Sequence, residues 1–245
     1  GHMQVWMVEH GDPEYSIDAL REKGWREAEY LSERLSRLPV KAFYVSPLGR
    51  AKDTASCTLK KVNARAEECE WLREFQPDIS RPDVTSHRTI AWDWLPQDWM
   101  QEETYFKYDT WQDTEIFRQS QVGEEYKWVT GCLDELLKRH GYYREGHFYR
   151  AERPNNDTIV LFCHFGVACV LLSHLLNISP MVLWHGLCAA PSSVTTLATE
   201  ERRKGIASFR MLSFGDTSHL YAKGEPPSFA ARFCECFGNE GERCD

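Results

Sequence analysis

The sequence predicts an α/β fold in which helices flank a mainly parallel central sheet as a three-layer sandwich, with an inserted lid. Two apolar runs of strand length, residues 5–8 and 158–163, carry this prediction. Each is followed within two residues by a histidine, then within two more by a glycine, and then by a helical segment, residues 20–38 or 167–176. A strand, a turn and a helix in this order are typical of parallel sheets, because the helix makes the crossover to the next strand.

The segment after the first helix is expected to form a second strand, residues 42–45, and a second helix. Ser46 and Pro47 open that helix, since Ser is a preferred N-cap and Pro is favoured at the first helical position. Arg50 then lies in the first turn, and an arginine at a helix N-terminus is a natural site for an anion. Residues 65–72 are expected to form a third strand.

Residues 77–155 interrupt the alternation of strands and helices, and we interpret them as an insertion. The family resemblance given below implies that this lid insertion covers the substrate and sets its choice. Within them, residues 122–140 predict a helix whose apolar face includes Trp128. The insertion is also rich in aromatic rings, namely Trp92, Trp94, Trp99, Tyr105, Phe106, Tyr108 and Trp111. Two interpretations stay open: these rings stack on a flat or apolar leaving group, or they form a small core of the lid itself.

Two further strands, residues 193–198 and 206–214, are expected to close the sheet across a charged turn. The chain then forms one domain over residues 1–245, with residues 223–245 as a tail. Metal binding and an unstructured tail are the alternatives for the three cysteines of this tail. They are Cys234, Cys236 and Cys244.

Composition limits the function classes. The chain has 245 residues and a formal charge of −8, which argues against a nucleic-acid partner, since non-specific binding needs a basic surface. We find no apolar stretch long enough to span a bilayer and no signal peptide after residues 1–3, which resemble a tag remnant with the start methionine. The nine cysteines are odd in number and scattered, which favours free thiols in the cytoplasm. The oligomeric state stays open, although edge strands or the insertion could support a dimer.

Four polar side chains are expected to meet at one edge of the sheet. His10 and His164 each follow a strand, Arg50 begins a helix, and Glu74 follows the third expected strand. Ligands of open α/β sheets bind at the carboxyl ends of the strands, because the loops between strands and helices converge there. Gly11, directly after His10, permits a close approach of backbone and ligand.

These motifs resemble those of the histidine phosphatase superfamily, also called phosphoglycerate mutase-like, and in particular its small bacterial phosphatases. Residues 46–55 match the second motif of the family, and residues 72–74 are similar to the stretch that holds its acid. Residues 164–166 take the place of its second His and Gly, and residues 214–220 look like the late segment of the small bacterial enzymes. The opening motif of the family is Arg, His, Gly, which stands here as Glu, His, Gly at residues 9–11.

The resemblance implies hydrolysis of a small phosphomonoester without a metal or another cofactor. His10 would attack phosphorus and become a phosphohistidine. Arg50 and His164 would bind the phosphate oxygens, with Gly11 beside them. Glu74 would protonate the leaving oxygen and later deprotonate water.

Glu9 departs from the family pattern, because an arginine that binds phosphate is expected there. Two unit charges about 4 Å apart interact by roughly 4 kcal/mol at an effective dielectric near 20, so an anion at this position should strongly impair turnover. Three explanations stay open. Glu9 pairs with Arg50 and silences the site; or Glu9 is an introduced substitution; or basic residues of the insertion bind the phosphate instead. Those residues are Arg81, His87 and Arg88.

Two other functions compete with hydrolysis. A mutase is disfavoured, because the Arg, Tyr, Gly stretch that follows the acid in mutases has no counterpart in this sequence. The alternative from another class is a non-catalytic module that binds a phosphorylated ligand or a regulatory partner on the same scaffold.

Overall fold

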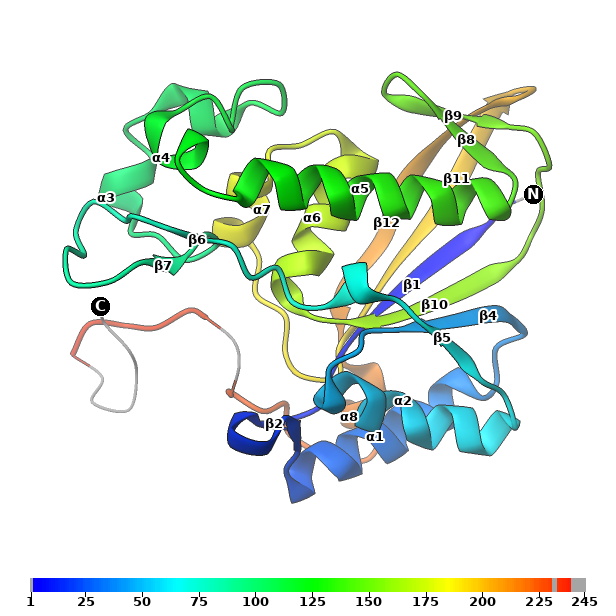
Figure 1. Ribbon diagram of the computed structural model, residues 1–245. Coiled ribbons are helices and arrows are strands. Elements are labelled where there is room, and N and C mark those ends of the chain that lie inside the picture. Colours follow the sequence, from blue (N-terminus) through cyan, green and yellow to red (C-terminus); the bar gives the residue numbers. More distant parts are fainter. Residues whose placement is uncertain (1, 231–232, 239–245) are drawn as a thin grey trace.

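The computed structural model describes residues 2–230 and 233–238, and a large sheet runs through its middle (Figure 1). Within these residues the sheet has eight strands, in the order β5, β4, β10, β1, β11, β12, β9, β8. In that order the bounds are Ala66–Glu68, Val40–Val45, Thr158–Cys163, Gln4–Glu9, Val194–Arg203, Ile206–Asp216, Phe148–Ala151 and Tyr142–Glu145.

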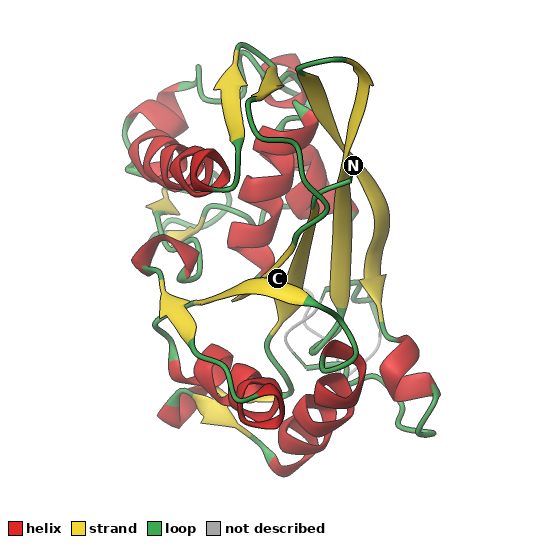
Figure 2. Ribbon diagram, turned by 90° about the vertical axis from the view of Figure 1, so that its right-hand side faces the viewer, coloured by secondary structure: helices red, strands yellow, loops and turns green. Residues whose placement is uncertain are grey.

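The sheet has a parallel half and an antiparallel half (Figure 2). β5, β4, β10 and β1 run parallel to one another, whereas β11, β12, β9 and β8 run antiparallel to their neighbours. Parallel strands place their carboxyl ends at one edge. The parallel half is therefore the part of the sheet that can gather loop residues into a site.

Helices cover both faces of the sheet, which confirms the α/β fold predicted from the sequence (Figure 1). On one face lie α1 (Glu22–Leu35), α2 (Gly49–Val62) and the short α8 (Ser218–Tyr221). On the other lie α5 (Val122–Arg139), α6 (Phe165–Leu176) and α7 (Pro180–Gly186).

Alternation along β10 shows how one strand serves both layers. Val160 and Phe162 pack in the core beneath α1 and α2, whereas Ile159 and Leu161 belong to the larger core beneath α5 and α6. Successive side chains of a strand point to opposite faces, so a fully apolar strand is stable only when both faces are covered. The buried, uninterrupted run 158–163 is explained by this position.

Residues 77–121 form a compact segment at one side of the molecule, which we call the lid segment (left in Figure 1). Its elements are β6 (Asp78–Ile79), β7 (Thr89–Ile90), α3 (Pro96–Trp99), η3 (Glu103–Phe106) and α4 (Glu115–Arg118). The remainder of the predicted insertion lies in the sandwich itself, since α5 packs on α6 and β8 and β9 extend the central sheet.

Most aromatic rings of the lid segment are buried. Trp94, Trp99, Tyr105 and Trp111 are each at most 4% exposed. These four rings belong to the larger core shared with α5, α6 and α7 rather than to a separate core of the lid, since Trp111, for example, packs against Tyr126 of α5. Trp92 is only partly buried and borders a cavity.

The predicted helix start at residues 46–47 is wrong. α2 begins at Gly49, and its N-cap residue, Leu48, has no side-chain oxygen to offer. Instead, the carboxylate of Asp18 accepts hydrogen bonds from the backbone N–H groups of Gly49 and Arg50, at 2.6 and 3.3 Å. A carboxylate from a distant loop thus supplies the cap, which no local pattern could indicate. That loop consists of β2 (Pro13–Glu14), η1 (Tyr15–Ile17) and β3 (Ala19–Leu20).

Two other local predictions need correction. The expected strand 65–72 shrinks to Ala66–Glu68, because Glu70–Leu72 forms a 3-10 helix, η2. Trp128 was placed on the buried face of α5, but it is 38% exposed. Other side chains of α5 fill the face toward α6, and the guanidinium of Arg73 lies over the exposed indole, 5.0 Å from its centroid.

The C-terminal segment lies against the body of the molecule as far as the structure describes it. The Ser228 hydroxyl donates a 2.6 Å hydrogen bond to the buried Asp12 carboxylate. The ring of Phe233 packs edge-on against Trp92, 5.7 Å between centroids. The predicted tail, residues 223–245, therefore contacts the body of the molecule at Ser228 and Phe233, whereas Phe237 is 98% exposed.

Candidate active site

Neighbouring parallel strands end side by side and place the candidate residues. β1 and β10 pair in register up to Glu9 and Cys163, so His10 and His164 follow at the same edge of the sheet. β4 pairs with the other side of β10, and Ser46 follows it. The convergence expected from the sequence is present for both histidines.

His10 is 6% exposed, and its ring lies 5.2 Å from that of His164 between centroids. Its Nδ1 lies 2.9 Å from the carbonyl oxygen of Gly11, which can only accept a hydrogen bond, so Nδ1 carries the proton and donates it. Burial lowers the pKa of His10 to about 4, and the ring is neutral near pH 7. The lone pair on Nε2 is thereby available for attack.

His164 is fully buried at the N-cap of α6. Its Nε2 lies 2.8 Å from the Ser46 hydroxyl, whereas its Nδ1 has no hydrogen-bond partner among the described residues. Burial lowers the pKa of His164 well below its usual value, and the nearby His10 and Arg50 lower it further. A buried ring nitrogen without a partner is unusual in a folded protein, and it is typical of positions that receive a ligand.

Arg50 lies at the start of α2, as expected, but its charge is already engaged. One terminal nitrogen donates to the Asp18 carboxylate at 2.8 Å, and the guanidinium lies 5.0 Å from the ring centroid of Tyr15. Its Nε is buried without a partner among the described residues. The sequence predicted an anion site at the N-terminus of α2, and the carboxylate of Asp18 occupies this position.

Glu74 lies beside the N-terminus of α6. Its carboxylate accepts hydrogen bonds from the backbone N–H groups of Phe75, Gly166 and Val167 at 2.8, 3.2 and 2.9 Å. Burial raises the pKa of Glu74, although these hydrogen bonds and Arg50 act in the opposite direction. A carboxyl group with a raised pKa can hold a proton and transfer it.

Glu9 is the last residue of β1, and its carboxylate makes no hydrogen bond within the described part of the chain. Burial raises the pKa of Glu9 well above its usual value; Glu74 raises it further, while Arg50 lowers it. Two carboxyl groups that interact in this way do not ionise independently. The raised pKa of both groups therefore favours a proton on this pair.

The contacts bear on the three explanations for Glu9. Arg50 forms its ion pair with Asp18 rather than with Glu9. Arg81 and Arg88 form ion pairs with Asp83 and Asp78 of their own lid segment. The exposed His87 lies 2.9 Å from the hydroxyl of its neighbour Ser86.

Gly11 has a packing role in addition to its place beside His10. A Cβ at this position would lie 2.7 Å from the carbonyl oxygen of Gly24. A Cβ at Gly24 would lie 2.3 Å from the backbone carbonyl oxygen of Asp12. The two glycines let the loop after β1 cross α1 at backbone distance. This approach fixes the loop that carries His10.

Sequence reasoning missed several residues around His10. The Thr54 hydroxyl accepts from the Gly11 N–H at 2.9 Å, and the Ser192 N–H donates to the His10 carbonyl at 2.9 Å. The Ser192 hydroxyl lies 3.0 Å from Nε2 of the buried His219. Thr54 and His219 both lie in segments that resemble the family motifs, so the sequence contained a signal for these two only.

The comparison with protein families agrees with this geometry. The model of the histidine phosphatase superfamily, branch 1, matches residues 4–211. The chain belongs to this superfamily. No curated protein matches the chain.

Solved structures show the same fold. A phosphoserine phosphatase mutant from Entamoeba histolytica, solved in complex with phosphoserine, is 20% identical with a TM-score of 0.57; the alignment covers 89% of this chain and 99% of the other. A mycobacterial glucosyl-3-phosphoglycerate phosphatase is 18% identical with a TM-score of 0.59, and 89% of this chain and 100% of the other are covered.

The remaining sequence predictions concern metals and membranes. Across residues 2–230 and 233–238, three or more His, Cys, Asp or Glu side chains nowhere gather as they would around a metal ion. Cys234 and Cys236 are exposed, and Cys244 lies outside the described residues. In the same part of the chain, no helix has the length and apolar character needed to cross a membrane.

Proposed function

We propose that this chain hydrolyses a small phosphomonoester through a phosphohistidine intermediate on His10. The observation that carries the proposal is the state of His10, a neutral, buried imidazole whose Nδ1 is held by the Gly11 carbonyl and whose Nε2 is free. A neutral imidazole in a fixed tautomer is a competent nucleophile toward phosphorus.

The other candidates have matching roles. Nε2 of His10 attacks phosphorus, the ester P–O bond breaks, and Glu74 gives its proton to the leaving oxygen. Water then attacks the phosphorus of the phosphohistidine while Glu74 takes a proton from that water, the P–N bond to His10 breaks, and inorganic phosphate leaves the neutral imidazole. Arg50 and His164 hold the non-bridging oxygens, where phosphoryl transfer needs positive charge and hydrogen-bond donors. This reaction requires no metal and no cofactor.

The proposed activity depends on whether the carboxyl group of Glu9 is protonated. Ionised, it repels a phosphate dianion; protonated, it removes that repulsion and can donate a hydrogen bond to a phosphate oxygen. Its raised pKa extends the pH range in which the proton is present. We therefore propose a weak phosphatase whose activity increases toward acidic pH.

A non-catalytic phosphate-binding relative is the second candidate. Two observations favour it: Asp18 pairs with Arg50, and Glu9 stands where the family has an arginine. In either case we propose a reducing, cytoplasmic location, which the odd number and scattered placement of the nine cysteines support.

A comparison of three proteins tests the function. The unchanged chain, Glu9→Arg and the double variant Glu9→Arg, His10→Ala are assayed on phosphomonoesters with a chelator present. We expect activity that rises in the single variant and disappears in the double variant, with an acid-labile phosphoenzyme only when His10 is present. Inactivity of all three proteins would favour the binding module, and Glu9→Arg no faster than the unchanged chain would contradict the role given to Glu9.

A further inference from the structure

The peptide group between His10 and Gly11 is held at both of its ends. Its N–H, which belongs to Gly11, donates to the Thr54 hydroxyl at 2.9 Å. Its carbonyl, which belongs to His10, accepts from the Ser192 N–H at 2.9 Å. These two anchors matter because β1 ends at Glu9, so the sheet itself does not hold His10. The Gly11 carbonyl, which accepts the proton of Nδ1, follows directly after this peptide group and depends on the same anchors.

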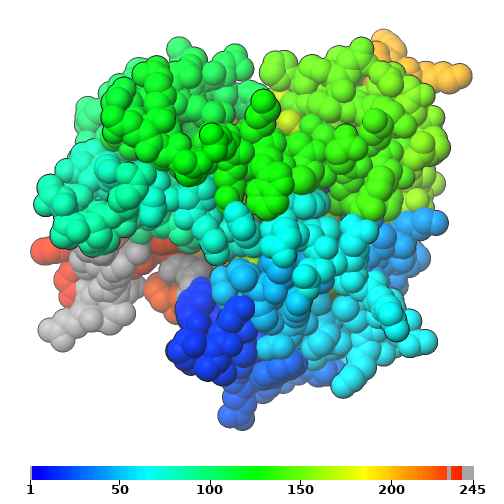
Figure 3. All heavy atoms as spheres, in the orientation of Figure 1, coloured from blue at the N-terminus to red at the C-terminus, as the bar shows by residue number. Residues whose placement is uncertain are grey.

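The loop after His10 is open to solvent on its outer side. In Figure 3 this loop (blue) lies at the surface of the molecule. Two of its residues, Tyr15 and Ile17, are 56% and 71% exposed. The position of His10 therefore depends largely on contacts of the inner side, and the hydrogen bond from the Ser192 N–H is one of them.

Ser192 donates this hydrogen bond from a left-handed backbone conformation, with φ at +66°. A residue with a side chain is strained in this region, and it stays there only when its surroundings hold it firmly. Ser192 is fully buried, and its hydroxyl lies 3.0 Å from Nε2 of His219. The contact with His219 is therefore placed to hold Ser192 in the conformation in which its N–H meets the His10 carbonyl.

The ring of His219 is in turn oriented by Arg34. A terminal nitrogen of Arg34 lies 3.2 Å from Nδ1 of His219 and forms an ion pair with Asp216 at 2.6 Å. A guanidinium can only donate, so Nδ1 accepts, and Nε2 carries the proton that it donates to the Ser192 hydroxyl. Burial and then the charge of Arg34 lower the pKa of His219 to about 4, although Asp216 acts in the opposite direction. The ring is therefore neutral near pH 7, in a single tautomer.

We propose that His219, oriented by Arg34, is a positioning residue for His10 and acts by holding Ser192 in its left-handed conformation. It acts through the backbone of His10 and not through the phosphate. This role rests on the proposed function, because it treats His10 as the nucleophile. It also gives a purpose to residues 214–220, the late segment that resembles the small bacterial phosphatases and that the proposed reaction steps do not use.

Nuclear magnetic resonance of the chain, isotopically labelled at its histidine nitrogens, tests this role without turnover. The signals of His10 are those that disappear in His10→Ala. Near pH 7 we expect the unchanged chain to show His10 with its proton on Nδ1. In His219→Ala the share of the form with the proton on Nε2 should rise at least about fivefold, because the Gly11 carbonyl is no longer held in place. The matched control His174→Ala, which also removes a buried histidine, should leave this share unchanged.

Changes at Ser192 test how His219 acts. Glycine adopts a positive φ without steric cost, so the double variant His219→Ala, Ser192→Gly should return the tautomers of His10 to those of the unchanged chain. His219→Gln, whose amide can donate to Ser192 and accept from Arg34, should also keep them. Ser192→Ala removes a single oxygen and should shift the tautomers as His219→Ala does, even if the latter fails to fold. Unshifted tautomers in Ser192→Ala, or a shift in His219→Ala that Ser192→Gly does not reverse, would overturn the inference.

Hydrolysis of phenyl phosphate in the Glu9→Arg background gives a second measurement. We expect His219→Ala to lower kcat about tenfold and to leave KM within about twofold, because a displaced nucleophile impairs attack more than binding. Ser192→Gly should restore kcat. A higher KM with unchanged kcat would overturn the inference and leave the proposed function standing. Tautomers of His10 that depend on His219 in a chain without turnover would contradict the proposed function and leave the positioning of His10 standing.

Discussion

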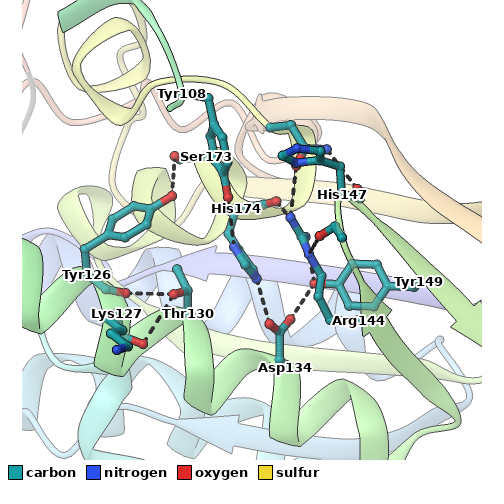
Figure 4. Close-up of polar contacts among 12 residues, drawn as sticks. Tyr108, Tyr126, Lys127, Thr130, Asp134, Arg144, His147, Tyr149, Ser173 and His174 are labelled. Carbon is teal, nitrogen blue, oxygen red and sulfur yellow. Dashed lines mark hydrogen bonds and ion pairs between the residues drawn. The ribbon is translucent and has the colours of Figure 1, made fainter. Parts of the chain in front are cut away.

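The two ends of α6 carry two buried histidines in opposite situations. His164 caps the helix and has a ring nitrogen without a partner among the described residues. His174, in the last turn, has both nitrogens engaged: Nε2 lies 2.8 Å from the Asp134 carboxylate and Nδ1 lies 3.4 Å from the Tyr108 hydroxyl (Figure 4). The Tyr149 hydroxyl donates to the other Asp134 oxygen at 2.6 Å.

This contrast separates a structural polar cluster from a functional one. The His174 cluster joins the lid segment, α5, α6 and β9, and its members satisfy one another (Figure 4). The cluster around His10 leaves a His164 nitrogen and the Arg50 Nε buried without partners among the described residues. Buried polar groups are normally satisfied within the protein, so unmet hydrogen-bonding capacity at a sheet edge indicates a place for a ligand.

Loss of the nucleophile should have the largest effect. His10→Ala removes the atom that attacks phosphorus, and we expect phosphatase activity to fall by at least about a thousandfold in any background with measurable turnover. His174→Ala is the matched control, because it also removes a buried histidine, but from the cluster around Asp134, and should leave kcat within about twofold when the protein is folded. Equal losses in both variants would contradict the distinction between the clusters.

Breaking the structural cluster should reduce stability rather than activity. Asp134→Ala leaves His174 and Tyr149 without their shared acceptor, and we expect a loss of about 2 to 3 kcal/mol in the free energy of unfolding. Urea unfolding measures this loss. Asp109→Ala, on the exposed surface of the lid segment, should change the free energy by less than about 0.5 kcal/mol. A comparable loss in Asp109→Ala would mean that the cluster has no special role.

The pH dependence of activity should identify the proton on Glu9. Because its pKa is raised, Glu9 is protonated below that pKa and negative above it, so kcat/KM should fall as the pH rises through this value. Glu9→Gln keeps the shape without the charge, and it should remove this limb and increase kcat/KM by about ten- to a hundredfold at pH values well above the pKa of Glu9. A limb that persists in Glu9→Gln would assign the titration to Glu74 instead.

Removing the Asp18 carboxylate should produce the smallest effect. The Asp18 side chain is 39% exposed, so its ion pair with Arg50 is worth at most about 1 kcal/mol. Asp18→Asn keeps an acceptor for the Gly49 N–H but frees the Arg50 charge. We expect inorganic phosphate to bind about two- to fivefold more tightly, as measured by calorimetry. Weaker binding would show that Asp18 helps to build the phosphate site rather than competing for it.

Prediction from the sequence succeeded where a structure depends on the spacing of apolar residues that are close together in the chain. The apolar run 158–163 and the periodic segment 122–140 identify a strand and a helix directly, because burial imposes those periods. It failed at the start of α2, where the capping carboxylate comes from Asp18, 31 residues away from Gly49. It also failed at Trp128, since helical period alone does not tell which edge of an apolar stripe meets a neighbour.

The sequence by itself determined the order of the elements and the positions of His10, His164, Arg50 and Glu74 at their ends, because periodicity and turn residues are local properties. Only the tertiary structure decided which of these residues are engaged. The Asp18 carboxylate forms an ion pair with Arg50, and the Glu74 carboxylate accepts a hydrogen bond in the first turn of α6. The indole of Trp92 lies beside the Glu74 carboxylate. Such contacts join residues that are distant along the chain, and their strength depends on burial and distance, which exist only once the sheet has brought its strand ends together.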